Sequence, residues 1–94
     1  MKFAVVATNR YRQDYKYLAK TGLDTGKLEQ VIDLLAAGIR LPESYHDHGL
    51  HGDLQGTRAC HIGPDWLLQY VKDSKHLVLI LISTGDHRRV LGVE

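Results

Sequence analysis

An apolar run at residues 77–82 constrains the fold of this chain more than any other feature of its sequence. In a strand, successive side chains point to opposite faces, and here both faces are apolar. The run therefore predicts the central, fully covered strand of a sheet. Strand-like runs cover residues 57–62, 66–72 and 76–83. Only Gly63-Pro64 and Asp73-Ser74 separate them, and such short links favour antiparallel hairpins.

The first half of the chain predicts one strand and two helices. Residues 3–7 form a short apolar run, and Thr8 or Asn9 behind it can cap a helix. Apolar residues at helical spacing predict a first helix over residues 10–20, closed by Gly22, and a second from Asp24 or Thr25 to Gly38. The order β-α-α-β-β-β predicts an α+β domain in which a helical hairpin packs on one face of an antiparallel sheet.

The composition describes one domain and excludes several classes of protein. Ninety-four residues with 44% hydrophobic content can bury a core without a disulfide, and we expect a single domain over residues 1–94. The net charge of +1 alone does not indicate a nucleic-acid binder, so any basic surface must come from local clustering. Cys60 is the only cysteine, and no apolar run approaches the roughly 18 residues of a membrane span. We therefore expect a cytoplasmic protein that does not contact membranes.

The second half of the chain carries a mixture of side chains that a core would not recruit. The mixture comprises Asp47, His48, Arg58, His61, Asp65, Trp66 and His87. A hairpin turn at Gly63-Pro64 brings His61 close to Asp65 and Trp66. His48 and His87 can join them only if the loop over residues 41–56 and the C-terminal tail fold over the same end of the sheet.

If these residues converge, proton transfer is the chemistry they favour. Imidazoles titrate near neutral pH and can act as acid or base. Cleaving RNA through its own 2'-hydroxyl needs a base, an acid and positive charge near the phosphate, and histidines, a carboxylate and Arg58 cover those roles without a metal. Trp66 would add a face on which a base could stack, worth roughly 1–3 kcal/mol.

Each residue also has a purely structural interpretation. Asp65 can cap the turn after Pro64, Trp66 can belong to the core, and Arg58 can be a solvated strand residue. Cys60 is most simply a small buried hydrophobe. The remaining histidines, His46, His51 and His76, are assigned structural or surface roles. The spacing of His46, His48 and His51 matches no zinc pattern, so we expect no metal.

Three separated segments agree in residue type and spacing with a known family. They are Tyr45-His46-Asp47-His48-Gly49-Leu50-His51-Gly52, the run over residues 56–70, and Thr84-Gly85-Asp86-His87. The chain resembles the YafQ-type toxins of the RelE superfamily. Those toxins share a D-H-x-L-x-G segment, an R-x-x-H-x-x-P-D-W-x-L-x-Y segment and a terminal T-G-x-H. The match covers the whole chain, so the resemblance implies a RelE-like fold.

The resemblance also implies a function. It implies a bacterial toxin of a type II toxin-antitoxin pair that enters the ribosomal A site and cuts mRNA there, without a cofactor. The family's acid-base group falls on His48, His61, Asp65 and His87, with Trp66 beside them, and Arg58 matches an arginine assigned to the phosphate. Which histidine is base and which is acid stays open. The implied partners are a DinJ-like antitoxin, the 70S ribosome and mRNA, with operator DNA reached only through the antitoxin.

Two positions depart from the family pattern. Relatives commonly have an arginine before the T-G-x-H segment and a phenylalanine near the C-terminus, where this chain has Ser83 and Leu91. Arg88 and Arg89 can restore positive charge for RNA binding, or they can be an ordinary solvated pair. The departures leave a second hypothesis open: a catalytically impaired RelE-like binding module that occupies the ribosome or corepresses its operon with the antitoxin.

Overall fold

The computed structural model describes residues 2–92 and contains helices, strands and two short 3-10 turns. The elements are β1 (Ala4–Ala7), α1 (Asn9–Lys20), α2 (Thr25–Ala36), η1 (Glu43–Tyr45), β2 (His48–Gly49), η2 (Gly52–Leu54), β3 (Arg58–Gly63), β4 (Trp66–Asp73), β5 (Val78–Gly85) and α3 (His87–Leu91). The predicted α+β class and the predicted order of strands and helices are confirmed. The structure adds β2 inside the expected loop and α3 at the end.

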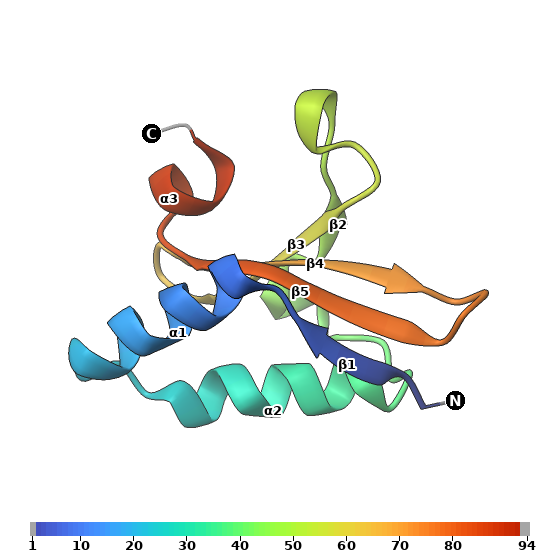
Figure 1. Cartoon of the computed structure of the whole chain (residues 1–94), viewed down its shortest axis with the longest axis horizontal. Coiled ribbons are helices and arrows are strands. Elements are labelled where there is room, and N and C mark those ends of the chain that lie inside the picture. Colours follow the sequence, from blue (N-terminus) through green and yellow to red (C-terminus); the bar gives the residue numbers. More distant parts are fainter. Residues whose placement is uncertain (1, 93–94) are drawn as a thin grey trace.

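One sheet joins all the strands, in the order β1-β5-β4-β3-β2. The two predicted hairpins, β3 with β4 and β4 with β5, are antiparallel as expected. The sheet is nevertheless not wholly antiparallel, because β1 pairs with β5 in parallel. The chain leaves β1 through the two helices and returns only in β5, and such a crossover allows parallel pairing. In Figure 1, α1 and α2 lie on one side of the sheet, and α3 and η2 on the other.

β5 is an interior strand, but it is neither the middle one nor fully covered. It lies between β1 and β4, and β4 is the middle strand. Leu79 and Leu81 are buried in the core beneath the helices, whereas Ile80 and Ile82 are only half-buried. The expectation of full cover is therefore wrong for this strand. The helices cover one face of the sheet, and little of the chain is available to cover the other.

Each long helix begins at a residue predicted to cap it. The Thr8 hydroxyl accepts a hydrogen bond from the Tyr11 amide at 3.2 Å, and donates to the Leu81 carbonyl of β5 at 2.9 Å. Asp24 accepts from the Gly26 amide at 3.0 Å at the start of α2. Satisfying the free amides at a helix start stabilises the helix. Thr8 also fixes the start of α1 to the sheet.

Asp47 anchors the segment between α2 and β3, which the sequence predicts as a long loop. The Tyr70 hydroxyl donates to the Asp47 carboxylate at 2.6 Å, and Arg58 Nε donates to the same oxygen at 3.3 Å. β2 pairs with β3 through His48 opposite Ala59. The loop therefore folds against the edge of the sheet.

The sheet register is irregular at two places, and both affect where side chains point. One irregularity separates His61 from Gly63 in the pairing of β3 with β4. The other lies between Gln69 and Tyr70, opposite Ser83 and Leu81 of β5, so that Ile82 has no direct partner. An extra residue in one strand reverses the alternation of side chains beyond it.

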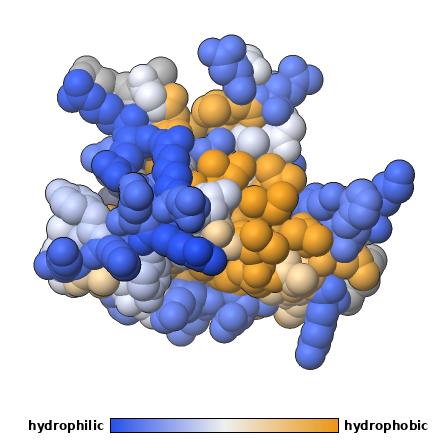
Figure 2. All heavy atoms as spheres, in the orientation of Figure 1, coloured by the Kyte–Doolittle hydropathy of each residue, from blue (hydrophilic) through white to orange (hydrophobic). Residues whose placement is uncertain are grey.

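Apolar side chains also reach the surface on the β1 side of the molecule. Val5 is 46% exposed and Val6 is 49% exposed in this edge strand. Figure 2 shows hydrophobic side chains gathered over β1 and β5 on the face turned toward the viewer. Within residues 2–92, no helix is both long and apolar enough to cross a membrane.

Replacing Leu28 by Ala should lower the free energy of unfolding by about 2–5 kcal/mol, because the vacated space lies in a close-packed core. Leu28 is 0% exposed in α2. Leu23→Ala removes the same atoms from a side chain that is 43% exposed and should cost less than about 1 kcal/mol. The shift of the urea midpoint measures both losses. Equal losses for the two variants would contradict the core described above.

Candidate active site

His61 of β3 lies at the centre of a cluster of imidazole rings. Its neighbours in the strand, Cys60 and Ile62, are buried in the core beneath the helices. Because side chains alternate along a strand, His61 projects from the opposite face of the sheet. Three rings surround it, with centroid distances of 5.4 Å to His46, 6.2 Å to His48 and 5.4 Å to His87.

Asp65 holds His87 in this cluster. One carboxylate oxygen, Oδ1, accepts a hydrogen bond from the His87 amide at 2.9 Å and contacts His87 Nδ1 at 2.5 Å. Asp65 has a φ of 50° in the tight β3–β4 turn, a conformation that Asp tolerates better than most residues. The backbone hydrogen bond from His87, followed by its side-chain bond, lowers the pKa of Asp65. The carboxylate is therefore ionised near neutral pH and orients the imidazole.

The surroundings of His61 favour its neutral form. Burial lowers the pKa of His61, and the nearby His87, His46 and His48 lower it further, although the Tyr45 backbone opposes the shift. Within residues 2–92, its buried Nδ1 has no hydrogen-bond partner. A neutral imidazole can accept a proton, so His61 suits the role of a base.

His48 and His46 reach the cluster from the segment that Asp47 anchors. His48 Nδ1 lies 2.7 Å from the His46 carbonyl oxygen, which fixes its ring relative to the chain. His46, with a φ of 48°, ends η1. The sequence assigns His46 a structural role, yet its ring lies as close to His61 as that of His87. The signal that could have identified it is its position two residues before His48, in a segment that follows the sheet edge.

A hollow opens beside the cluster, with a volume of about 480 Å³. His46 and His61 line it, together with Pro64 of the β3–β4 turn and Lys27 of α2. Lys27 brings positive charge to the rim, which favours a negatively charged ligand.

Arg58 points away from the imidazole cluster. It is three residues before His61 in the same strand, so the two side chains leave opposite faces of the sheet. Its guanidinium bonds Asp47 between the two loop histidines. In this structure Arg58 therefore holds the histidine-bearing segment in place, rather than facing the site directly.

Trp66 does not offer an open face for stacking, and that expectation is wrong. The side chain packs in the core, and the residue is only 6% exposed. Its indole Nε1 donates to the Thr84 hydroxyl of β5 at 3.0 Å. Indoles are usually buried where the N–H finds a partner, so the core interpretation of Trp66 holds.

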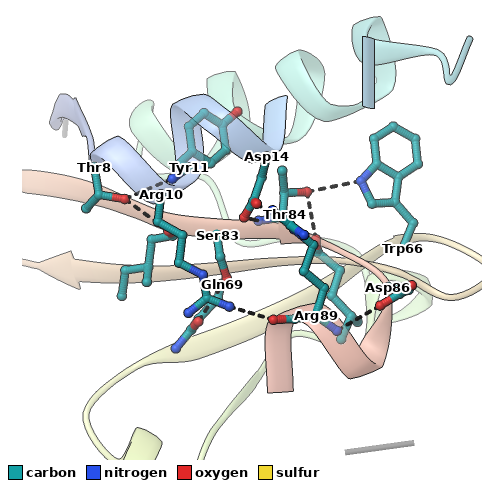
Figure 3. A network of polar contacts seen from close by, with 12 residues as sticks. Thr8, Arg10, Tyr11, Asp14, Trp66, Gln69, Ser83, Thr84, Asp86 and Arg89 are labelled. Carbon is teal, nitrogen blue, oxygen red and sulfur yellow. Dashed lines mark hydrogen bonds and ion pairs between the residues drawn. The ribbon is translucent and has the colours of Figure 1, made fainter. Parts of the chain in front are cut away.

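The C-terminal arginines differ in their surroundings. Arg89 Nε donates to Oδ1 of the buried Asp14 in α1 at 2.6 Å, and the Arg10 side chain donates to the Arg89 carbonyl at 2.5 Å (Figure 3). Arg89 thus links α3 to α1 and is not an ordinary solvated residue. Arg88 and Arg89 are both exposed, and the Arg89 side chain keeps 50% of its surface exposed beside these bonds.

The two positions that depart from the family pattern lie under and within α3. Ser83 is fully buried and donates to the Gln69 side chain at 3.1 Å. Leu91 is half-buried in the last turn of α3. Neither supplies a charge or an aromatic ring.

The cysteine and the two remaining histidines take no part in the cluster. Burial raises the pKa of Cys60 to about 12, so the thiol stays protonated. His76 bonds Asp73 in the β4–β5 turn, and His51 precedes η2 at the surface. Across residues 2–92, no group of three or more His, Cys, Asp or Glu side chains is placed to hold a metal ion.

Comparison with known proteins agrees with this geometry. The family model for the bacterial toxin of type II toxin-antitoxin systems, YafQ, matches residues 3–92. The mRNA interferase toxin YafQ of Escherichia coli K12 is 35% identical over 90% of this chain and 91% of its own length.

Solved structures give the same result. The E. coli DinJ-YafQ toxin-antitoxin complex matches with a TM-score of 0.88 and 31% identity, over 98% of this chain and 100% of the matched one. A metal-bound toxin from Helicobacter pylori matches with a TM-score of 0.86 and 33% identity, over 96% of this chain and 99% of the other. The resemblance seen in the sequence motifs is confirmed, and this chain belongs to the YafQ family of bacterial toxins of type II toxin-antitoxin systems.

Proposed function

We propose that this chain, an mRNA interferase toxin by its family, cleaves mRNA in the ribosomal A site by metal-independent acid-base catalysis. The observation that carries the proposal is the convergence of three imidazoles on His61, one of them held by the Asp65 carboxylate. The cluster lies on the face of the sheet that the long helices leave uncovered, where RNA can reach it.

The proposed reaction is a transfer of the phosphate from one oxygen to another within the RNA. A base removes the proton from the 2'-hydroxyl, and the oxygen attacks the adjacent phosphorus. The bond to the 5'-oxygen breaks, and an acid gives that oxygen a proton. The products are a 2',3'-cyclic phosphate and a 5'-hydroxyl. Each proton transfer of this kind typically contributes about 10²–10⁴ to the rate.

We assign His61 as the base and His87 as the acid. The lowered pKa of His61 keeps it neutral near pH 7, ready to take the 2'-hydroxyl proton. Asp65 contacts His87 through Nδ1, which leaves Nε2 to face the leaving oxygen. The N–H groups of His46 and His48, with Lys27 at the rim of the hollow, are suited to donate to the phosphate.

The proposed partners follow from the relatives. The E. coli YafQ toxin forms a complex with DinJ. We extend this to a DinJ-like antitoxin that binds the present chain in the cytoplasm and keeps it from the ribosome. Operator DNA would be contacted only through that antitoxin.

The alternative is a binding module that occupies the ribosome or corepresses its operon without cutting RNA. The absence of an arginine at position 83 and of an aromatic residue at position 91 is the feature that favours it. Primer-extension mapping on translating ribosomes distinguishes the two functions, since a non-catalytic binder leaves no cuts in the A site.

His61→Ala and His87→Ala should each lower the rate of A-site cleavage by about 10²-fold or more, since each removes one proton-transfer group. The rate is measured by primer extension on programmed ribosomes. His76→Ala, which removes a surface imidazole in the β4–β5 turn, serves as the matched control and should cleave at the normal rate. Full activity in both cluster variants would falsify the assigned site.

The pKa of His61 should lie below its ordinary value of 6.5 in the free toxin, since burial and neighbouring imidazoles both oppose its protonation. His87→Gln removes the strongest of the neighbouring charges, so the midpoint should move up toward 6.5. Titration of the ring by NMR gives both midpoints. Lys75→Ala removes a positive charge from the β4–β5 turn. It is the control and should leave the midpoint of His61 unchanged. A wild-type midpoint at or above 6.5 would contradict the assignment of His61 as a base that is neutral at pH 7.

A further inference from the structure

We propose that Asp14 and Arg89 form a clamp that positions His87, so that Arg89 acts through α3 and not by binding RNA. The inference rests on the proposed function, because it adds positioning residues to that site. Asp14 lies in α1, far from the histidines in sequence, and neither it nor Arg89 belongs to the imidazole cluster.

Asp14 is a charged residue in a place that charges rarely occupy. Its side chain is 0% exposed. Oδ1 accepts from Arg89 Nε at 2.6 Å, and Oδ2 accepts from the Thr84 amide at 3.2 Å. A buried carboxylate is tolerated only when its oxygens are paired, so the cost of burying Asp14 makes its partners hard to displace.

The two partners of Asp14 flank the residue that the clamp positions. Thr84 is the penultimate residue of β5, and Arg89 lies in α3 two residues after His87. Thr84 is itself fixed, since its hydroxyl donates to the Leu67 carbonyl at 2.8 Å and accepts from Trp66. Figure 3 shows the Arg89 side chain reaching from α3 past the end of β5 toward Asp14 in α1. One carboxylate therefore ties the segment that carries His87 at both of its ends.

α3 needs such a tie because it is too short to be stable alone. It has five residues, and an isolated helix of that length does not form in water. Asp86 caps its start by accepting from the Arg89 amide at 2.8 Å, and Val90 is buried beneath it. Arg10 adds a second bond from α1 to the Arg89 carbonyl. The contact of His87 with Asp65 then depends on α3 keeping this position.

The clamp also explains the orientation of the Arg89 side chain without a contact to RNA. Its Nε is committed to Asp14, and its guanidinium lies 5.9 Å from the ring centroid of Tyr17 in α1. Both contacts direct the side chain toward the helical layer of the fold, whereas His61 projects from the other face of the sheet. An arginine placed to bind a phosphate beside His61 would point toward that face.

A double-mutant cycle tests the clamp. Asp14→Asn, Arg89→Gln and the double variant are prepared, and A-site cleavage is measured with kcat and KM separated. Each single variant should lower kcat by about tenfold to a hundredfold, since a catalytic group displaced by about 1 Å can lose that much. KM should stay within about threefold, and the double variant should be no slower than the slower single one, because both changes break the same contact. Asp33→Asn removes an exposed carboxylate from α2 and serves as the charge-matched control with unchanged kcat.

Amide hydrogen exchange in the free toxin gives a readout that does not depend on cleavage. In Arg89→Gln, the amides of His87 and Val90 should exchange about tenfold faster or more, while the amides of β4 keep their protection. If the wild-type chain cuts no RNA, the proposed function fails, yet the exchange data still decide whether the clamp holds α3. A raised KM with α3 protection unchanged would show that Arg89 binds RNA directly and would overturn the inference. Arg89→Lys keeps the charge and provides a milder variant if Arg89→Gln does not fold.

Discussion

The unequal cover of the sheet is the constraint on which the rest of this structure depends. α1 and α2 occupy one face, where the apolar side chains of β3, β4 and β5 meet them and exclude water. Within residues 2–92, no further long helix covers the other face, and the short α3 covers only part of it. Polar and titratable side chains can stay hydrated there at low cost. The imidazole cluster lies on this partly uncovered face, and strand alternation places His61 at its centre.

The sequence predicts local structure well because local structure depends on neighbouring residues. Helical spacing, the caps at Thr8 and Asp24, and the hairpin that joins His61 to Asp65 all follow from contacts within a few residues. The parallel pairing of β1 with β5 connects residues more than seventy positions apart, and no local pattern encodes it. The place of His46 beside His61 is also non-local, because the path of the loop over the sheet edge depends on the bond between Asp47 and Tyr70.

The arginines illustrate a related limit of sequence interpretation. The sequence links Arg58 to RNA because it matches a family arginine, and it leaves Arg89, close behind His87, as either an RNA contact or a solvated residue. In the folded chain both guanidiniums bond carboxylates, Asp47 and Asp14, and each of these bonds fixes a segment that carries histidines. A residue that neighbours a site in sequence can support it from the other side of a sheet, and the alternation of strand residues decides which side that is.

The unpaired Ile82 in β5 has a consequence for how this fold can vary. Up to Leu81 the strand directs its odd-numbered residues into the core, but beyond Ile82 the buried Ser83 faces Gln69 on the opposite side and Thr84 turns toward Trp66 and Asp14. A strand that lost this one residue could keep the same pairs, Leu81 with Tyr70 and Ser83 with Gln69, and would direct Ser83 and Thr84 to the same faces as before. The bulge thus lets β5 hold one more residue than a regular strand, and a relative that is one residue shorter there can present the same surface before α3.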